Sequence, residues 1–295
     1  MIGLYIANFI MLSPKVPVEK IMRIDRERGF GDAIDEYLNT WERSRFHAKS
    51  DDAMIRGEII HNPATCDGPE KVAIIAHGIT AAKEADIKYA KIFYDMGYNV
   101  IIFDERYFGT SKAKYCTLGM KEAEDIKRLC KFARKKFGKD CILGLHGESM
   151  GGASVLRMLD TEKPDFVVAD CPFSDLELLI KEIATGKASV LGTAATYTAR
   201  LIGYLRYKYD YFKVKPIDSV KTCNVPICFM HGADDALIDS GHSRKMYELC
   251  RNPLSELHLF RNADHAMSIV SDRERYEKII REFVKKVEDA RVNHG

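Results

Sequence analysis

The regular alternation of short apolar runs with helical stretches, from residue 71 to the C-terminus, is the feature that most constrains the fold. The runs are rich in Val and Ile without polar alternation, which is typical of strands in a sheet covered on both faces. Helical stretches between them, such as 120–137, predict a mostly parallel, doubly wound sheet of the α/β class. The runs are KVAIIAH (71–77), NVIIFD (99–104), CILGLH (141–146), FVVADC (166–171), PICFMH (226–231) and SELHLF (255–260).

The chain of 295 residues is long enough for one large domain with an appendage. Residues 1–44 are expected to form an N-terminal helical extension. Residues 45–295 are expected to form the α/β domain, which opens with two strands around a polar Ser-Asp-Asp turn. The segment at about 174–215 is longer than the usual connection between strands. We expect it to form a small cap insertion over the C-terminal edge of the sheet, where open α/β sheets bind ligands.

The apolar N-terminal segment, residues 2–12, has two interpretations. It is too short to span a bilayer, and neither a basic stretch nor a small-residue cleavage site marks it as a signal peptide. A helix packed on the domain is the favoured interpretation, because an apolar helix face is more often core than membrane contact. Contact of residues 2–12 with a membrane surface remains the alternative.

Charge and cysteine content argue against several classes of function. The formal net charge is only +2, and basic runs such as 134–136 lack interleaved aromatic residues, so no nucleic-acid partner is expected. The eight cysteines are scattered without a C-x-x-C pair or metal-ligand spacing. This pattern favours a reducing cytoplasm over a disulfide framework, and it predicts neither a metal site nor an organic cofactor.

The sequence Gly-Glu-Ser-Met-Gly at 147–151 matches the G-x-S-x-G pattern of a nucleophile elbow. It directly follows an apolar run and precedes a helical run, which is the strand–turn–helix context that the elbow needs. So sharp a turn forces Ser149 into a strained backbone conformation and leaves little room at Gly147 and Gly151. We therefore predict that Ser149 is a nucleophile, whereas Glu148 has no predicted role.

A serine needs a base and an orienting acid to act as a nucleophile. In this fold the acid and the histidine follow the serine in chain order, each after a later strand. HGADD (231–235) follows one apolar run and supplies Asp234 and Asp235, and either carboxylate could reach an imidazole. His265 follows the next run and is the predicted base, since the other histidines lack such a placement.

An acyl-transfer serine also needs backbone N–H donors for the developing oxyanion. One should be the amide after the nucleophile, that of Met150. The other should come from the loop HGITAA (77–82), with the amide of Ile79 favoured and that of Thr80 as the alternative. The first two residues of the loop are expected to shape it rather than react.

Together these residues resemble the α/β-hydrolase superfamily, specifically its esterase/lipase/serine-aminopeptidase-like branch, over about 45–290. Cytoplasmic bacterial hydrolases, most of them uncharacterised, carry a similar elbow and DCPFSD segment. The resemblance selects Asp235, because the family's acid is the fifth residue of H-G-x-x-D. The family often has glycine where this chain has Tyr107 and Asp264. The shared motifs are His77-Gly78-Ile79, D-x-R-x-x-G-x-S at 104–111, H-G-E-S-M-G at 146–151, DCPFSDL at 170–176 and H-G-x-x-D at 231–235.

The resemblance implies an α/β-hydrolase fold and a serine hydrolase of the carboxylesterase kind. Such an enzyme cleaves small-molecule carboxylic esters through an acyl-enzyme on Ser149, with Asp235 and His265 completing the triad. Acylglycerol lipase, thioesterase and serine peptidase activities stay open on the same triad. An alternative of another class is a non-catalytic binding protein on a hydrolase fold, because fold alone does not dictate activity.

Overall fold

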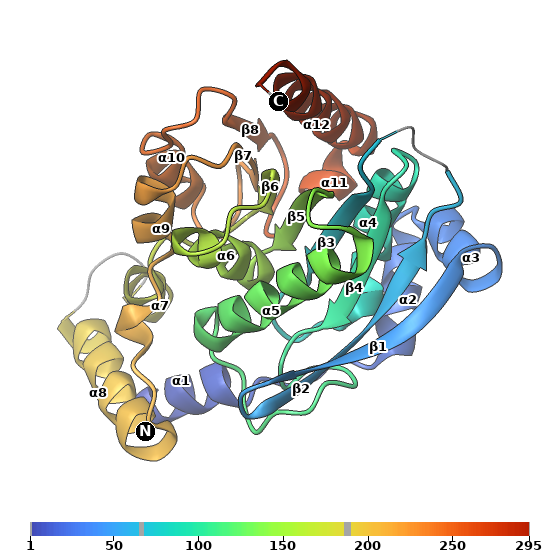
Figure 1. Ribbon diagram of the computed structural model, residues 1–295. Coiled ribbons are helices and arrows are strands. Elements are labelled where there is room, and N and C mark those ends of the chain that lie inside the picture. The colour runs from blue at the N-terminus through green and yellow to red at the C-terminus, as the bar shows by residue number, and fades with distance from the viewer. Residues whose placement is uncertain (1, 65–67, 186–189, 295) are drawn as a thin grey trace.

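The computed structural model describes residues 2–64, 68–185 and 190–294. Its centre is an eight-stranded sheet in the order β1-β2-β4-β3-β5-β6-β7-β8 (Figure 1). The pairs β1–β2 and β2–β4 are antiparallel, and all later neighbours run parallel, so the predicted mostly parallel sheet is confirmed. The strands are β1 (Glu42–Ser50), β2 (Ala53–His61), β3 (Lys71–Ala76), β4 (Asn99–Asp104), β5 (Ile142–Glu148), β6 (Phe166–Asp170), β7 (Ile227–Gly232) and β8 (Glu256–Phe260).

Helices surround this sheet. They are α1 (Ile2–Met11), α2 (Val18–Glu27), α3 (Gly31–Asn39), α4 (Ile87–Tyr94), α5 (Met120–Phe137), α6 (Met150–Arg157), α7 (Leu176–Thr185), α8 (Val190–Tyr207), α9 (Pro216–Thr222), α10 (Gly241–Tyr247), α11 (Ser268–Ser271) and α12 (Arg273–His294). Short 3₁₀ turns lie at Lys83–Asp86, Met158–Asp160 and Tyr211–Lys213.

Successive residues of each inner strand enter two different cores. In β3, Ala73 and Ile75 join a buried cluster with side chains of α3, α4 and α12. Val72 and Ile74 of the same strand join a second cluster with side chains of α5, α6 and α10. Both faces of the sheet are therefore covered, which explains why the inner strands show no polar alternation.

The long helix α5 illustrates how local sequence sets the element bounds. Its bounds, Met120–Phe137, agree with the predicted helix. Gly119 and Gly138, at its two ends, have φ of 106° and 104°, a region that side chains disfavour. The Glu122 carboxylate accepts the Gly119 amide (2.9 Å), and the basic run 134–136 lies in the last turn, where it complements the helix dipole.

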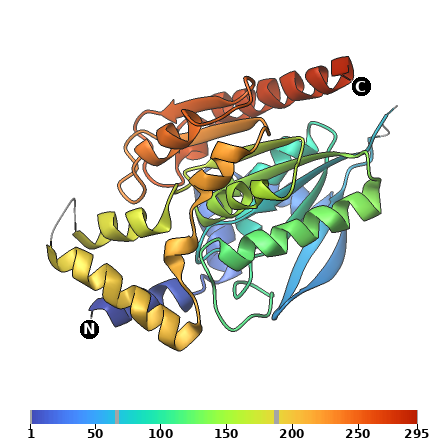
Figure 2. The same cartoon turned by 60° about the vertical axis from the view of Figure 1, so that its left-hand side comes forward.

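The N-terminal helix α1 lies beside α8, in the segment that sequence analysis assigned to the cap (Figures 1 and 2). A Cβ atom on Gly3 would lie 2.8 Å from Cγ2 of Thr198, so the two helices approach closely at this point. The Tyr207 hydroxyl donates to Oδ1 of Asn8 (2.9 Å). The division of the chain at residue 44 remains a prediction, and β1 begins at Glu42.

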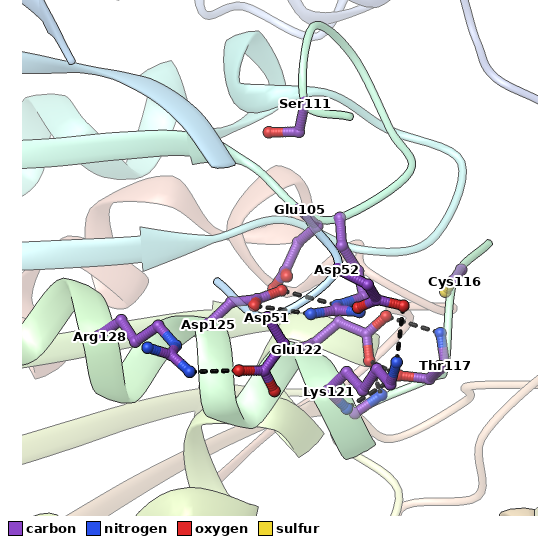
Figure 3. Close-up of polar contacts among 12 residues, drawn as sticks. Asp51, Asp52, Glu105, Ser111, Cys116, Thr117, Lys121, Glu122, Asp125 and Arg128 are labelled. Carbon is purple, nitrogen blue, oxygen red and sulfur yellow. Dashed lines mark hydrogen bonds and ion pairs between the residues drawn. The ribbon is translucent and has the colours of Figure 1, made fainter. Parts of the chain in front are cut away.

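A buried arginine holds the loop after β4 in place. Arg106 donates to both carboxylate oxygens of Asp125 on α5, at 2.7 and 2.8 Å. It also donates to Oδ1 of Asp52, in the turn between β1 and β2, at 3.1 Å. Lys121 reaches the other oxygen of Asp52 at 2.7 Å (Figure 3). The loop, the hairpin turn and α5 are therefore joined by charge-assisted hydrogen bonds.

Within the described residues, no helix combines the length and apolar character needed to cross a membrane. The seven cysteines in these ranges are free thiols. The eighth, Cys66, lies outside the described residues.

Candidate active site

Ser149 occupies the turn between β5 and α6, where its backbone has φ 55° and ψ −114°. Non-glycine residues rarely adopt such a conformation, so the turn carries the strain expected of an elbow. A Cβ atom on Gly147 would lie 2.5 Å from the carbonyl carbon of Gly151. One on Gly151 would lie 2.0 Å from the carbonyl oxygen of Ala76, so both positions must lack a side chain. The Ser149 amide donates to the Asp170 carbonyl at 2.8 Å, which ties the turn to β6.

The structure brings Ser149, His265 and Asp235 together. The Oγ of Ser149 lies 2.9 Å from Nε2 of His265, and Nδ1 of His265 lies 2.8 Å from Oδ2 of Asp235. A carboxylate only accepts, so Nδ1 carries the hydrogen and the Nε2 lone pair faces the serine hydroxyl. Of the two adjacent aspartates, Asp235 contacts the imidazole, whereas Asp234 accepts a hydrogen bond from the Asn262 amide at 2.7 Å.

Asp235 and His265 each favour the charged form of the other. Burial raises the pKa of Asp235, but hydrogen bonds from His231 and His265 outweigh it and hold the pKa below its ordinary value. Burial lowers the pKa of His265, but the hydrogen bond to Asp235 and the negative charge of that residue leave it raised. An ionised Asp235 therefore favours an imidazolium at His265, the form that a general base reaches during attack.

His231 is a site residue that sequence analysis set aside. Its Nε2 lies 2.8 Å from the Ile238 carbonyl and 3.3 Å from Oδ2 of Asp235, and its Nδ1 lies 2.7 Å from the Ser243 hydroxyl. The other Asp235 oxygen accepts the Leu237 and Ile238 amides at 2.9 and 2.8 Å. The H-G-x-x-D spacing was the available signal, since it sets His231 four residues before the acid.

One predicted oxyanion donor, Met150, follows the serine in the chain, and the loop of the other, Ile79, lies beside the serine. Met150 opens α6, and the first amides of a helix have no acceptor within it. The loop that carries Ile79 lies beside the elbow, because a Cβ atom on Gly78 would be 3.5 Å from Cβ of Ser149. His77 fixes this loop: its Nδ1 lies 2.7 Å from the Gly78 carbonyl, and its Nε2 accepts an amide hydrogen at 2.9 Å. Its predicted role in shaping the loop agrees with these contacts.

Glu148, which had no predicted role, lies between the elbow and a buried charge network. Its Oε2 accepts the Tyr89 hydroxyl at 2.6 Å and lies 3.7 Å from Nζ of Lys88. Lys88 is itself buried and lies 3.7 Å from Asp25 on α2. A Cβ atom on Gly78 would lie 3.2 Å from Oε1 of Glu148, so this carboxylate borders the loop of the predicted oxyanion donors.

The remaining motif residues build the loops around the site. The Asp104 carboxylate accepts the Lys83 and Thr110 amides at 2.9 and 2.8 Å, and a Cβ atom on Gly109 would lie 2.1 Å from it. Tyr107 has φ 75°, a left-handed conformation that glycine adopts without strain, which agrees with the glycine that the family resemblance implies at this position. Asp264 is the second position at which the family resemblance implies glycine. Its Oδ1 accepts the Ala236 and His265 amides at 2.9 and 2.8 Å.

An apolar cluster adjoins the elbow. It contains Met150, with Ile79 packed against it, and also Phe173, shortly before α7, and Leu176, the first residue of α7. The same cluster continues to Ala7, Ile10 and Met11 of α1 and to Ala199 of α8. The N-terminal helix therefore packs into the apolar cluster that carries one predicted oxyanion donor and contacts the other.

Two groups within the described ranges place metal-ligand atoms within 4.8 Å of one another: Cys171 with Asp235 and His265, and Cys228 with Glu256 and His258. The ligand form of cysteine is the thiolate. Burial raises the pKa of both thiols well above the ordinary value, which keeps them protonated. This donor chemistry fits a metal poorly, and neither group is assigned one.

Comparison with known proteins now identifies the family. The model of the prolyl oligopeptidase family matches residues 86–290, well over half of the chain. The chain belongs to the prolyl oligopeptidase family. This family membership confirms the resemblance to the α/β-hydrolase superfamily and makes the protein a hydrolase.

Relatives of this prolyl oligopeptidase family member span bacteria and vertebrates. "Uncharacterized protein YqkD" of Bacillus subtilis (strain 168) is 28% identical over 293 residues, covering 98% of this chain and 94% of that protein. "Lysophosphatidylserine lipase ABHD12" of Xenopus tropicalis is 25% identical over 199 residues. The match covers 60% of this chain and 46% of that protein. The esterase Pf2001 of Pyrococcus furiosus shares the fold at TM-score 0.68 and 23% identity, covering 85% of this chain and 95% of that one.

Proposed function

We propose that this hydrolase cleaves carboxylic esters through an acyl-enzyme on Ser149. One observation carries the proposal: Ser149 Oγ lies 2.9 Å from Nε2 of His265, whose other ring nitrogen is held 2.8 Å from Asp235. A nucleophile within hydrogen-bond reach of a base, with the base oriented by an acid, is the arrangement that acyl transfer requires. A protein that only binds ligands would have no use for the strained backbone at Ser149.

In the proposed reaction, Nε2 of His265 takes the hydroxyl proton while Ser149 Oγ attacks the ester carbonyl. The amides of Met150 and Ile79 donate to the oxygen that becomes negative, and Asp235 stabilises the imidazolium. Collapse of the intermediate breaks the bond to the leaving oxygen, which receives the proton from Nε2. A water molecule, deprotonated by the same nitrogen, then attacks the acyl carbonyl. The bond to Ser149 Oγ breaks, the Oγ recovers the proton from Nε2, and the carboxylic acid leaves.

The apolar cluster around Met150 and Phe173 makes the surroundings of the elbow apolar, which favours an acyl chain over a peptide backbone, because buried peptide groups need hydrogen-bond partners. Acylglycerol lipase activity is the second candidate, since the same cluster reaches as far as α1 and α8. The name of the Xenopus relative, a lysophosphatidylserine lipase, points in the same direction.

A fluorophosphonate probe tests the proposed nucleophile. It should label the wild-type protein on Ser149 and leave Ser149→Ala unlabelled, and that variant should keep its melting temperature. An unlabelled wild-type protein that hydrolyses no acyl ester would overturn the proposal and favour a binding role.

A substrate panel then separates the classes. We expect p-nitrophenyl esters, from acetyl to palmitoyl, to turn over faster than matching thioesters and aminoacyl arylamides. An optimum at long chains would support the lipase candidate. Faster hydrolysis of the arylamides or thioesters would instead assign peptidase or thioesterase activity to the same triad.

A further inference from the structure

Apart from Asn8, helix α1 presents apolar or aromatic side chains on its buried and its exposed side alike, which is unusual for a helix on a protein surface. Its ten residues include no charged side chain. Ala7, Ile10 and Met11 are buried in the cluster beside the site. The opposite side presents large apolar side chains to solvent at Leu4, Tyr5 and Phe9, joined by Leu12 directly after the helix, and these are between 41% and 72% exposed.

Helix α8, which packs beside α1, repeats this pattern. Thr196, Ala199 and Gly203 face inward, at the three- and four-residue spacing of one helix face. A second stripe, between 49% and 60% exposed, consists of Tyr197, Leu201, Tyr204 and Leu205. We use the name α1–α8 face for these four side chains together with the four exposed ones at and just after α1. Monomeric proteins rarely gather exposed apolar residues in this way unless the surface binds something.

Basic side chains predominate around the α1–α8 face, and Asp210, directly after the basic stretch, pairs with Arg200 of α8 at 2.7 and 2.9 Å. Residues 1–18 and 187–209 contain no Asp or Glu. They carry Lys15 beside α1 and Arg206 and Lys208 at the end of α8, and Arg206 donates to Asn8 of α1 at 3.3 Å. Long basic side chains at the rim of an apolar surface extend toward anionic lipid headgroups, and tyrosines favour the boundary between water and hydrocarbon.

The helices of the α1–α8 face also pack against the apolar cluster beside the elbow. Ala7, Ile10 and Met11 of α1 and Ala199 of α8 belong to the cluster that contains Met150 and packs against Ile79. Both helices lie at one corner of the molecule, away from α12 on the far side of the sheet (Figures 1 and 2). If the protein binds a ligand through this corner, the apolar cluster lies between that ligand and the elbow.

We propose that the α1–α8 face binds the surface of an anionic lipid bilayer. A second copy of the chain is the less suitable occupant, because a two-fold interface would bring together two surfaces that carry the same basic side chains, Arg206 and Lys208. Binding to lipid does not require ester cleavage. The proposal therefore goes beyond the proposed function, and lipid binding can be measured without an assay of hydrolysis. Ser149→Ala protein should bind lipid as the wild type does.

Flotation with lipid vesicles tests the proposal. We expect wild-type protein to float with vesicles of equimolar phosphatidylcholine and phosphatidylglycerol, and much less with phosphatidylcholine alone. Leu201→Ser/Leu205→Ser and, separately, Tyr5→Ser/Phe9→Ser should each weaken binding at least about tenfold. The matched control is Leu38→Ser/Leu249→Ser, which removes leucines exposed by 46% and 39% outside the α1–α8 face and should bind as the wild type does.

Melting curves and circular dichroism spectra establish that each variant is folded. Binding by wild type and control, with loss in both face variants, supports the proposal. Wild-type protein that fails to float with anionic vesicles overturns it, as do face variants that float like the wild type. A wild-type dimer that these substitutions convert to monomer, without vesicle binding, assigns the α1–α8 face to a second copy and also overturns it.

Discussion

Nε2 of His231 lies 3.3 Å from Oδ2 of Asp235, the same oxygen that faces His265. Loop amides hold the second oxygen of Asp235, so its carboxylate is surrounded by donors. Burial would raise the pKa of Asp235, but these hydrogen bonds keep it below the ordinary value. The carboxylate therefore stays ionised throughout the neutral pH range, which the stabilisation of an imidazolium requires.

Asp235→Asn should lower kcat by roughly 10³ to 10⁴ on a p-nitrophenyl ester, because an amide no longer holds His265 in the tautomer that presents its lone pair to Ser149. Steady-state kinetics measure this loss. The matched control is Asp234→Asn, one residue away, whose carboxylate accepts only the Asn262 amide among the hydrogen bonds described. Equal losses in the two variants would contradict the assignment of Asp235 as the orienting acid.

The pH profile of kcat/KM should fall on the acid side as His265 becomes protonated, because the base must be neutral. Its pKa is raised by the Asp235 hydrogen bond and charge and, to a smaller extent, by the charge of Glu148, against an opposing effect of burial. Glu148→Gln should therefore move the acid limb to lower pH. Glu27→Gln, at an exposed position on α2, is the control and should leave the limb in place. If the acid limb of Glu148→Gln moved to higher pH, the Glu148 charge would not be raising the pKa of His265.

Gly151→Ala should destabilise the fold by more than about 3 kcal/mol and abolish turnover, because its Cβ atom would lie 2.0 Å from the Ala76 carbonyl oxygen. Gly31→Ala is the matched control: its Cβ atom would meet only Arg26, at 3.6 Å, and alanine is the better helix former. Denaturant unfolding compares the two. Similar midpoints for both variants would show that the elbow tolerates a side chain.

Glu105→Gln should stabilise the protein at neutral pH. Both carboxylate oxygens of Glu105 are buried without a hydrogen-bond partner, and burial, with the charges of Glu122 and Asp125, raises its pKa well above the ordinary value (Figure 3). An acid with a raised folded-state pKa contributes its full stability below its unfolded pKa, and this is lost as pH rises toward the folded value.

The melting temperature of Glu105→Gln should therefore exceed that of the wild type by an amount that grows from pH 5 to pH 8. The exposed substitution Glu19→Gln should show no such trend. A constant difference across this range would mean that ionisation of Glu105 is not the cause.

The fold and the elbow could be predicted from the sequence because both depend on neighbours in the chain. Apolar runs without polar alternation require covered strands, and the glycines at 147 and 151 reflect the steric limits of one turn. The bounds of α5 agree with the prediction for the same reason, since its flanking glycines are local signals.

Contacts between distant segments were decided only by the tertiary structure. Sequence periodicity does not distinguish Asp234 from Asp235, whose carboxylates have different partners in the fold. Nor does it pair Glu148 with Tyr89, 59 positions away, or place α1 beside α8. The sequence by itself determined which elements form and the chain order of Ser149, Asp235 and His265. Tertiary packing decided which side chains meet and which apolar faces stay exposed, because burial depends on every segment that reaches the same point in space.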